Sequence, residues 1–293
     1  TELNWKSKKN GLVYASWVLG LLIWFALRAM ATVKNDPIQF TTLLAQVPLR
    51  FTLSIQYLGK IFFPFQLSVF PMLRETSYLW GLLTLLLLGG LIYVAKKDDR
   101  KRIWAGLGWF LLFLLPLFLL PSALNDQDFE HRLYVPVLGI LLCVSQAPWF
   151  KEEIQGRVMG IVLGIGVLFT GLNLYHQQSF KDNISFWQAA VASTPHSAYA
   201  NMMLGARVYP TDTIKGRTLF QEAYRLNPKE KYINYYLGRD YLDQMHVDSA
   251  RKYLLDELQI SKYFDTYFLL SRVEFMRHDS MQSLHYMEAF LEK

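Results

Sequence analysis

The chain has 293 residues, of which 52% are hydrophobic and 18% are charged. Soluble proteins of this size carry about 25% charged residues, so the composition excludes an ordinary soluble globular protein. The deficit is uneven, because residues 1–175 hold several near-continuous apolar runs, whereas residues 176–293 have the composition of a water-soluble protein. We therefore expect a membrane domain over 1–175 and a soluble domain over 176–293.

The net charge of +6 raises the question of a nucleic-acid partner. The basic residues cluster beside the apolar runs, in WKSKKN and AKKDDRKR, and form no separate basic domain. This distribution is typical of membrane-flanking charge, so we expect the lipid bilayer as a partner and no nucleic acid. The single cysteine, Cys143, cannot form an internal disulfide and leaves the redox compartment open. Because the chain begins with Thr and no signal peptide precedes its first apolar run, we expect it to be the C-terminal portion of a longer protein.

Segments apolar and long enough to cross a bilayer, which takes about 20 residues, lie at 11–31, 78–95, 103–121, 133–149 and 157–175. The basic residues between the second and third segments place that turn in the cytoplasm, on the same side as the N-terminus. The stretch 122–132 and everything after 175 then lie outside the cytoplasm. The sequence thus predicts an integral protein of a bacterial inner membrane or the endoplasmic reticulum.

This topology requires that the segment VPLRFTLSIQYLGKIFFPFQLSVFP, residues 47–71, does not cross the bilayer. Drawn as a helix, it carries apolar residues on one face (Phe51, Ile55, Leu58 and Phe62) and polar residues around the other (Arg50, Ser54, Gln56 and Lys60). Such an amphipathic pattern suits the membrane interface or a polar cavity between helices.

An internal repeat organises the second half of the chain. FWQAAVASTP (186–195) aligns with LFQEAYRLNP 33 residues later, and NMMLGARVY (201–209) aligns with NYYLGRDYL at the same spacing. A degenerate third copy runs over 267–291. The pattern resembles the tetratricopeptide (TPR) repeat, which implies stacked antiparallel helix pairs with a concave groove.

Small residues in these repeats indicate close packing between helices, notably Gly205, Gly238, Ala223 and Ala250. The many tyrosines indicate packing between repeats (Tyr232, Tyr235, Tyr236, Tyr241, Tyr253 and Tyr263). A few of them on the groove face are candidates to bind an extended peptide. The predicted fold class is therefore all-α, with polytopic membrane helices followed by a TPR α-solenoid.

A dense charged group precedes the fourth apolar run and consists of Asp126, Asp128, Glu130, His131 and Arg132. Charges beside a span are ordinary anchors, and Tyr134, two residues further on, fits the aromatic belt at the membrane surface. The alternative is a site for a charged substrate, because the group mixes an acid, an imidazole and a guanidinium on the non-cytoplasmic side. We assign Asp126 and Asp128 to the start of a helix.

Helix N-terminal amides and a guanidinium together suit a phosphate oxyanion, which makes Arg132 the leading candidate for such a site. Arg28, near the outer end of the first span, and Arg50, on the amphipathic segment, are candidates to add to it. An arginine inside a membrane segment is costly unless it pairs or serves a pathway.

Several stretches follow one another in the order seen in a known family: NDPIQF, PLRFTLSIQYLGKIFFPFQLSVFP, GLGWFLLFLLPLFLLPS and EHRLYVPVLGILL. Together they resemble the transmembrane and tetratricopeptide-repeat-containing (TMTC) proteins and their bacterial relatives, which are O-mannosyltransferase-like enzymes of the glycosyltransferase C superfamily. The likeness covers about 28–150, and the repeats follow in the same order. Its most specific piece is carried by Glu130, Arg132, Leu133, Tyr134, Pro136 and Gly139. His131 departs from the arginine usual in the animal proteins.

The resemblance implies transfer of a sugar, mannose in this family, from a polyprenyl-phosphate donor to a protein Ser or Thr hydroxyl. It further implies that Arg132 binds the donor phosphate, that Glu130 orients it or the acceptor, and that the repeats bind the acceptor protein. In such enzymes the catalytic acid lies in the first outer loop, which we expect upstream of Thr1.

The sequence contains no glycine-rich phosphate loop and no Cys/His metal spacing, so we predict no metal and no cofactor beyond the donor substrate. Two alternatives to the transferase stay open. One is a non-catalytic membrane-anchored TPR scaffold for partner proteins, and the other is a ligase for lipid-linked glycans.

Overall fold

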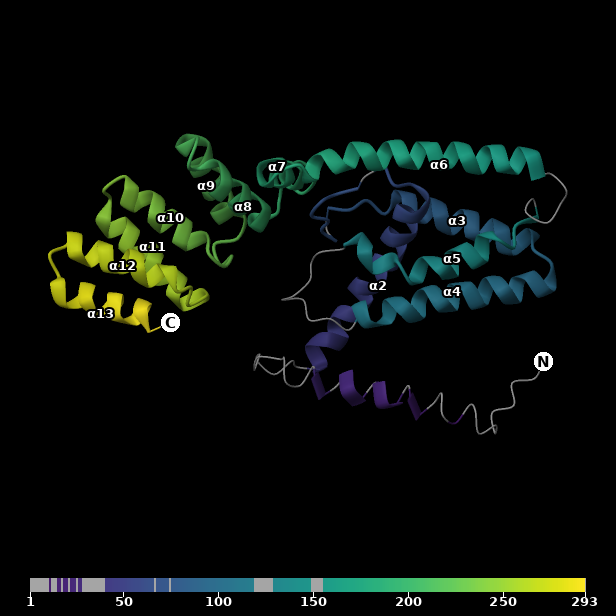
Figure 1. The fold of residues 1–293 in the computed structure, drawn as a ribbon, viewed down its shortest axis with the longest axis horizontal. Coiled ribbons are helices and arrows are strands. Elements are labelled where there is room, and N and C mark those ends of the chain that lie inside the picture. Colours follow the sequence, from purple (N-terminus) through teal and green to yellow (C-terminus); the bar gives the residue numbers. More distant parts are fainter. Residues whose placement is uncertain are drawn as a thin grey trace. The chain divides into compact units, whose positions relative to one another are not determined.

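The computed structural model describes residues 11, 15–16, 18–20, 22–24, 26–27, 40–65, 67–73, 75–118, 129–148 and 155–292. Every regular element among these residues is a helix and none is a β-strand, which confirms the expected all-α class (Figure 1). The chain separates into two compact units, Thr1–Ala45 and Gln46–Lys293. In the first unit, the residues described between 11 and 27 are helical.

The predicted membrane half forms helices of unequal length: α2 (Phe40–Phe62), α3 (Leu79–Val94), α4 (Lys97–Phe118), α5 (Pro136–Val144) and α6 (Gln155–Gln177). In the described residues, two helical stretches are long and apolar enough to cross a membrane, Lys97–Phe118 and Met159–Phe180. By length and composition, these two support the predicted spans at 103–121 and 157–175. Most of the predicted span at 11–31 lies outside the described residues.

The remaining two predicted spans are shorter than the sequence indicates. The helix α3 has 16 residues. The segment 133–149 contains only the nine-residue α5, preceded by the 3-10 turn η2 (Glu130–Leu133). Proline has no N–H to donate, so Pro136 sits in the first turn of α5 and cannot continue a helix begun further upstream. As drawn, α5 alone is too short for a full crossing.

Glycines let the helices of this half approach one another closely. A Cβ atom added to Gly106 on α4 would overlap the carbonyl oxygen of Gly139 on α5, and one added to Gly139 would overlap that of Gly106. A Cβ on Gly81 of α3 would likewise overlap the carbonyl oxygen of Ile55 on α2. Small residues at such crossings are typical of helices that pack inside a membrane.

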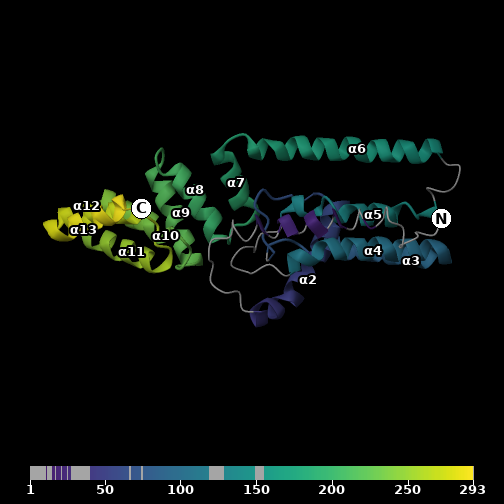
Figure 2. The same cartoon turned by 60° about the horizontal axis from the view of Figure 1, so that its bottom comes forward.

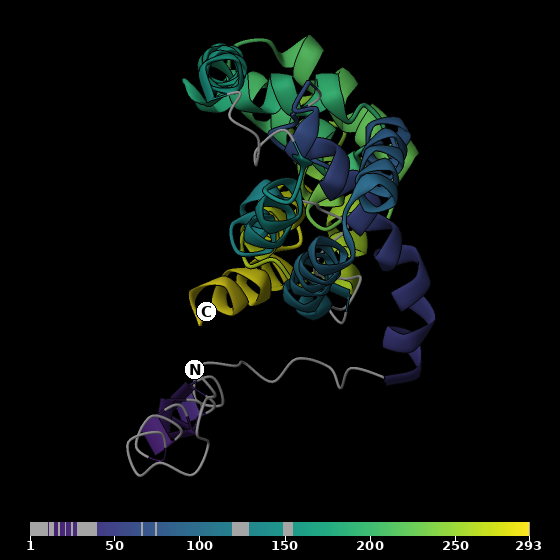
Figure 3. The ribbon, with the colours of Figure 1, turned by 90° about the vertical axis from the view of Figure 1, so that its right-hand side faces the viewer.

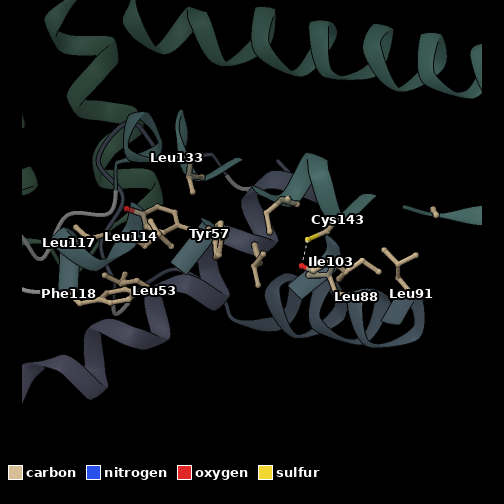
Figure 4. Packing of buried hydrophobic residues seen from close by; sticks show 14 of the residues in the cluster. Leu53, Tyr57, Leu88, Leu91, Ile103, Leu114, Leu117, Phe118, Leu133 and Cys143 are labelled. Carbon is tan, nitrogen blue, oxygen red and sulfur yellow. Dashed lines mark hydrogen bonds between the residues drawn. The ribbon is translucent and has the colours of Figure 1, made fainter. Parts of the chain in front are cut away.

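Around these crossings lies a buried apolar cluster, part of which Figure 4 shows. Tyr57 from α2, Ile103 from α4 and Ile140 from α5 are fully buried within it. The Cys143 thiol is buried too and donates a hydrogen bond to the Ile103 carbonyl at 3.3 Å. The predicted free cysteine is therefore a packing residue of the α4–α5 contact.

The helix α6 has a different environment. Figure 1 draws it as one straight helix and Figure 3 looks along it nearly end on. None of the residues in its most apolar window is buried, although the exposed side chains include Ile161, Leu163, Val167 and Leu168. Exposing so much apolar surface to water is unfavourable by about 25 cal/mol per Å². This helix is therefore suited to an apolar surrounding such as lipid.

The second half folds into short helices: α7 (Asn183–Ser193), α8 (Ala198–Val208), α9 (Thr213–Leu226), α10 (Ile233–Asp243), α11 (Val247–Ile260), α12 (Asp265–Met276) and α13 (Ser280–Leu291). They pack as the pairs α8/α9, α10/α11 and α12/α13 (Figures 1 and 2). The small residues predicted at the contacts are found there. Gly205 faces Phe220, Gly238 faces Leu254, and Ala223 is fully buried.

Polar contacts recur along these helix pairs. The Asn201 amide donates to the Pro195 carbonyl at 2.9 Å, and the Asn234 amide, 33 residues later, donates to the Pro228 carbonyl at 3.2 Å. Ion pairs also tie one helix pair to the next: α9 meets α10 through Arg217 and Asp240 at 2.9 Å, and α11 meets α12 through Arg251 and Glu274 at 2.5 Å.

Candidate functional site

The predicted charged group is anchored by a lysine from another helix. Glu130 opens the turn η2, and its Oε1 accepts a hydrogen bond from Lys60 Nζ at 2.6 Å. The Lys60 side chain is 7% exposed and that of Glu130 is 32% exposed, so the pair is largely shielded from water. Lys60 lies in the last turn of α2. The ion pair therefore joins α2 to η2 and balances the charge of the Glu130 carboxylate.

Arg132 lies on the same turn and is partly exposed. Its guanidinium carbon sits 5.9 Å from the centre of the Phe129 ring, a distance typical of a cation–π contact. The Arg132 backbone N–H donates to the Phe129 carbonyl at 3.3 Å, which closes the turn. The guanidinium is thus held beside the ring while the turn itself is fixed by Glu130.

Phe129 connects this turn to its surroundings. Its carbonyl accepts a hydrogen bond from the Tyr57 hydroxyl at 3.4 Å, and its ring stacks with that of His131 at 5.6 Å between centroids. The same ring meets Phe70 edge on at 6.3 Å. Residues from α2, from η2 and from the loop that follows α2 therefore meet at Phe129.

The other predicted site residues take different positions. The buried Arg50 donates from Nη1 to the Leu117 carbonyl at 3.2 Å, in the last turn of α4. Tyr134 is 78% exposed directly after η2, which suits a residue at a membrane surface. Arg28, Asp126 and Asp128 lie outside the described residues. Of the predicted set, the structure brings Glu130 and Arg132 together on one turn.

The partner of Glu130 was missed at the level of sequence. Lys60 was assigned only to the polar face of the amphipathic segment 47–71. A lysine at the end of such a helix, close to predicted membrane, is costly unless its charge is paired. That cost is the signal that points to a carboxylate partner, although the sequence does not show which carboxylate reaches it.

A second group of contacts joins the loop after α2 to the short helices. Phe70 is buried, and its ring lies 5.7 Å from the rings of both Trp187 on α7 and Tyr199 on α8. The Ser68 and Ser193 hydroxyl oxygens are 2.6 Å apart. Through Phe70, the aromatic contacts of the short helices continue to Phe129 and so to the charged turn.

Among the residues that the structure describes, no group of three or more His, Cys, Asp or Glu side chains is arranged to hold a metal ion. Compared with known proteins, the chain matches no family model and no curated protein. The sequence and structure define a class only: an all-helical chain with apolar helices suited to a membrane and a following array of packed helix pairs.

Proposed function

We propose that the chain belongs to a membrane glycosyltransferase that moves a sugar, mannose by its resemblance, from a polyprenyl-phosphate donor to a protein Ser or Thr hydroxyl. The observation that carries this proposal is the charged turn η2. There, one carboxylate, Glu130, faces two cations, Lys60 and Arg132. The surplus of positive charge at a shielded turn suits the oxyanion of a donor phosphate.

The roles of the two predicted residues differ. Arg132 is the phosphate-binding group, because its guanidinium offers several N–H donors in a planar fork. Glu130 is bonded to Lys60 at 2.6 Å, which supports a positioning role for it in holding the turn that carries Arg132. A general base needs an oxygen that meets the substrate, and the ion pair with Lys60 speaks against that assignment for Glu130.

The helix pairs α8–α13 support the acceptor-binding part of the proposal. Their spacing of 33 residues and the recurring Asn–Pro hydrogen bonds favour a TPR-like array. Aromatic side chains gather on its first helices, where the Tyr235 and Tyr263 rings lie 5.0 Å apart. In this proposal the array holds an extended acceptor polypeptide on the non-cytoplasmic side, the side to which the positive charges of the loops assign it.

The test is sugar transfer by the full-length protein in membranes, with polyprenyl-phosphate mannose as donor. Arg132→Ala removes the proposed phosphate contact, and we expect turnover to fall by about tenfold or more, since a hydrogen bond to a charged group contributes about 1.5–3 kcal/mol. Arg225→Ala is the matched control, because Arg225 is exposed on α9 and pairs with Glu222. Unchanged turnover in Arg132→Ala would reject the phosphate-binding role.

A scaffold without chemistry is the second candidate. It is favoured by the ion pair itself, since a charged turn neutralised by Lys60 also serves as a plain anchor at the membrane surface. Mass spectrometry of proteins from the non-cytoplasmic compartment, with and without the gene, separates the two. Loss of hexose on Ser or Thr supports the transferase, and an unchanged pattern supports the scaffold.

A further inference from the structure

A pocket of about 330 Å³ lies between the loop after α2 and the C-terminal end of α7. One wall comes from residues 67–76, and the other from Ser193 and Thr194. Its volume is at the lower end of the range of small-molecule sites, roughly 300–1,000 Å³. The pocket shares no residue with the charged turn η2, so it is a separate place for a ligand.

The polar groups of this pocket are arranged to accept hydrogen bonds. Thr76 and Thr194 donate their hydroxyl protons to the carbonyls of Met72 and Ala190, at 2.9 and 2.7 Å. Their oxygen lone pairs are the hydrogen-bonding capacity that remains. Ser193 likewise donates to its own helix, at 2.9 Å from the Ala189 carbonyl.

The one carboxylate among the described lining residues, Glu75, adds to this pattern. Its side chain is 15% exposed, and its Oε1 accepts the His196 backbone N–H at 3.0 Å. A carboxylate is an acceptor at both oxygens when ionised. Leu67 and Pro71 supply an apolar surface beside these oxygens, so that the lining is about half apolar.

A ligand for such a pocket must bring several hydrogen-bond donors that are spread in space. The acceptors belong to two separate segments and do not meet at one point, whereas an ammonium group converges its donors on a single atom. A neutral polyhydroxylated ring has donors around its edge and an apolar C–H face, which matches acceptors on two walls and Leu67 with Pro71 on another. An anion is disfavoured by Glu75.

We infer that this pocket binds a neutral sugar residue, of one or two rings, through Glu75 and the hydroxyl oxygens of residues 68, 76, 193 and 194. The site lies where the short helices meet the loop, and it requires no transfer chemistry. The inference therefore stands apart from the proposed function, and a scaffold with such a pocket binds glycans equally well.

The experiment is saturation-transfer NMR on the intact protein in lipid nanodiscs, with methyl α-mannoside and a mannose disaccharide as probes. We expect binding in the millimolar range and transfer signals from both the hydroxyl-bearing and C–H edges of the ring. Glu75→Gln removes the charged acceptor and should weaken the dissociation constant by about tenfold. Glu222→Gln, a carboxylate on α9 outside the pocket, should leave it unchanged.

A second variant protects the test against misfolding. Ser193→Ala removes only a hydroxyl from an exposed position at the mouth and should weaken sugar binding while leaving the helical content of the protein intact. Absence of sugar binding by the wild-type protein would overturn the inference. Binding of N-acetyl-lysine amide with no binding of either sugar would also overturn it, because the pocket would then select a cation.

Discussion

Lys60 Nζ lies 2.6 Å from Glu130 Oε1, across 70 residues of sequence. The lysine is almost fully buried, whereas the glutamate keeps about a third of its exposure. The pair fixes the end of α2 against the turn that carries Arg132. It is the contact on which the geometry of the candidate site depends, because Arg132 follows Glu130 by two residues on that turn.

Lys60→Met should destabilise the protein by removing the partner of a shielded carboxylate. Removing one member of a fully buried pair costs about 3–5 kcal/mol, and the partial exposure of Glu130 reduces our expectation to about 2 kcal/mol in the free energy of unfolding. Lys60→Arg keeps the cation and should retain most of the stability. Unfolding of the purified protein in detergent measures both.

A matched exposed pair provides the control. Lys101 and Asp98 lie 3.3 Å apart on α4, with both side chains more than two-thirds exposed. Lys101→Met should therefore change the free energy of unfolding by no more than about 0.5 kcal/mol. Equal effects of the two lysine substitutions would show that the Lys60–Glu130 pair contributes little.

The contact between the loop and α7 can be tested by a crosslink. The Ser68 and Ser193 oxygens are 2.6 Å apart, so a Ser68→Cys, Ser193→Cys double variant should form a disulfide under mild oxidation. Gel mobility after cleavage between the two positions measures the bond. Ser68→Cys with Ser185→Cys, which places the second cysteine at the other end of α7, should not crosslink. Failure of the first pair to crosslink would contradict the packing of the loop on α7.

Glycine at the helix crossing of α4 and α5 has a predicted energetic consequence. Gly139→Ala places a Cβ against the Gly106 carbonyl, and the resulting overpacking should cost about 1–3 kcal/mol of unfolding free energy. Gly89→Ala on α3 adds its Cβ to open space and should be neutral or stabilising, by up to about 1 kcal/mol. Thermal unfolding of the two variants in the same detergent compares them. A stable Gly139→Ala protein would contradict the close crossing.

The crossing also explains part of what the sequence could predict. Gly139 was singled out by resemblance, and Gly205 and Gly238 by the repeat, because a small residue at a helix contact leaves a signal in one chain segment. The Lys60–Glu130 pair and the Phe70–Phe129 contact leave none, since each joins segments at least 59 residues apart. Helix α5 was predicted too long because hydropathy continues through the 3-10 turn, whereas hydrogen bonding changes there.

Alkaline pH should destabilise the short helices through Tyr209. Burial, and then the hydrogen bonds that its hydroxyl donates to Asp240 and Asp243 at 2.9 and 3.1 Å, raise the pKa of Tyr209 above its usual value. Because the folded state keeps this proton to higher pH than the unfolded state, the stability it contributes is fully present below the usual pKa of about 10 and is lost as the pH rises through the folded-state value.

Tyr209→Phe removes both hydrogen bonds and the titrating group. We expect it to lower the free energy of unfolding at neutral pH by about 1–2 kcal/mol, because Asp240 keeps its bond to Arg217. We also expect it to remove part of the loss of stability above pH 10, at which the unfolded tyrosine ionises. Denaturant unfolding at a series of alkaline pH values measures both effects. An alkaline loss of stability identical in the wild type and Tyr209→Phe would show that this hydroxyl is not one of the groups responsible.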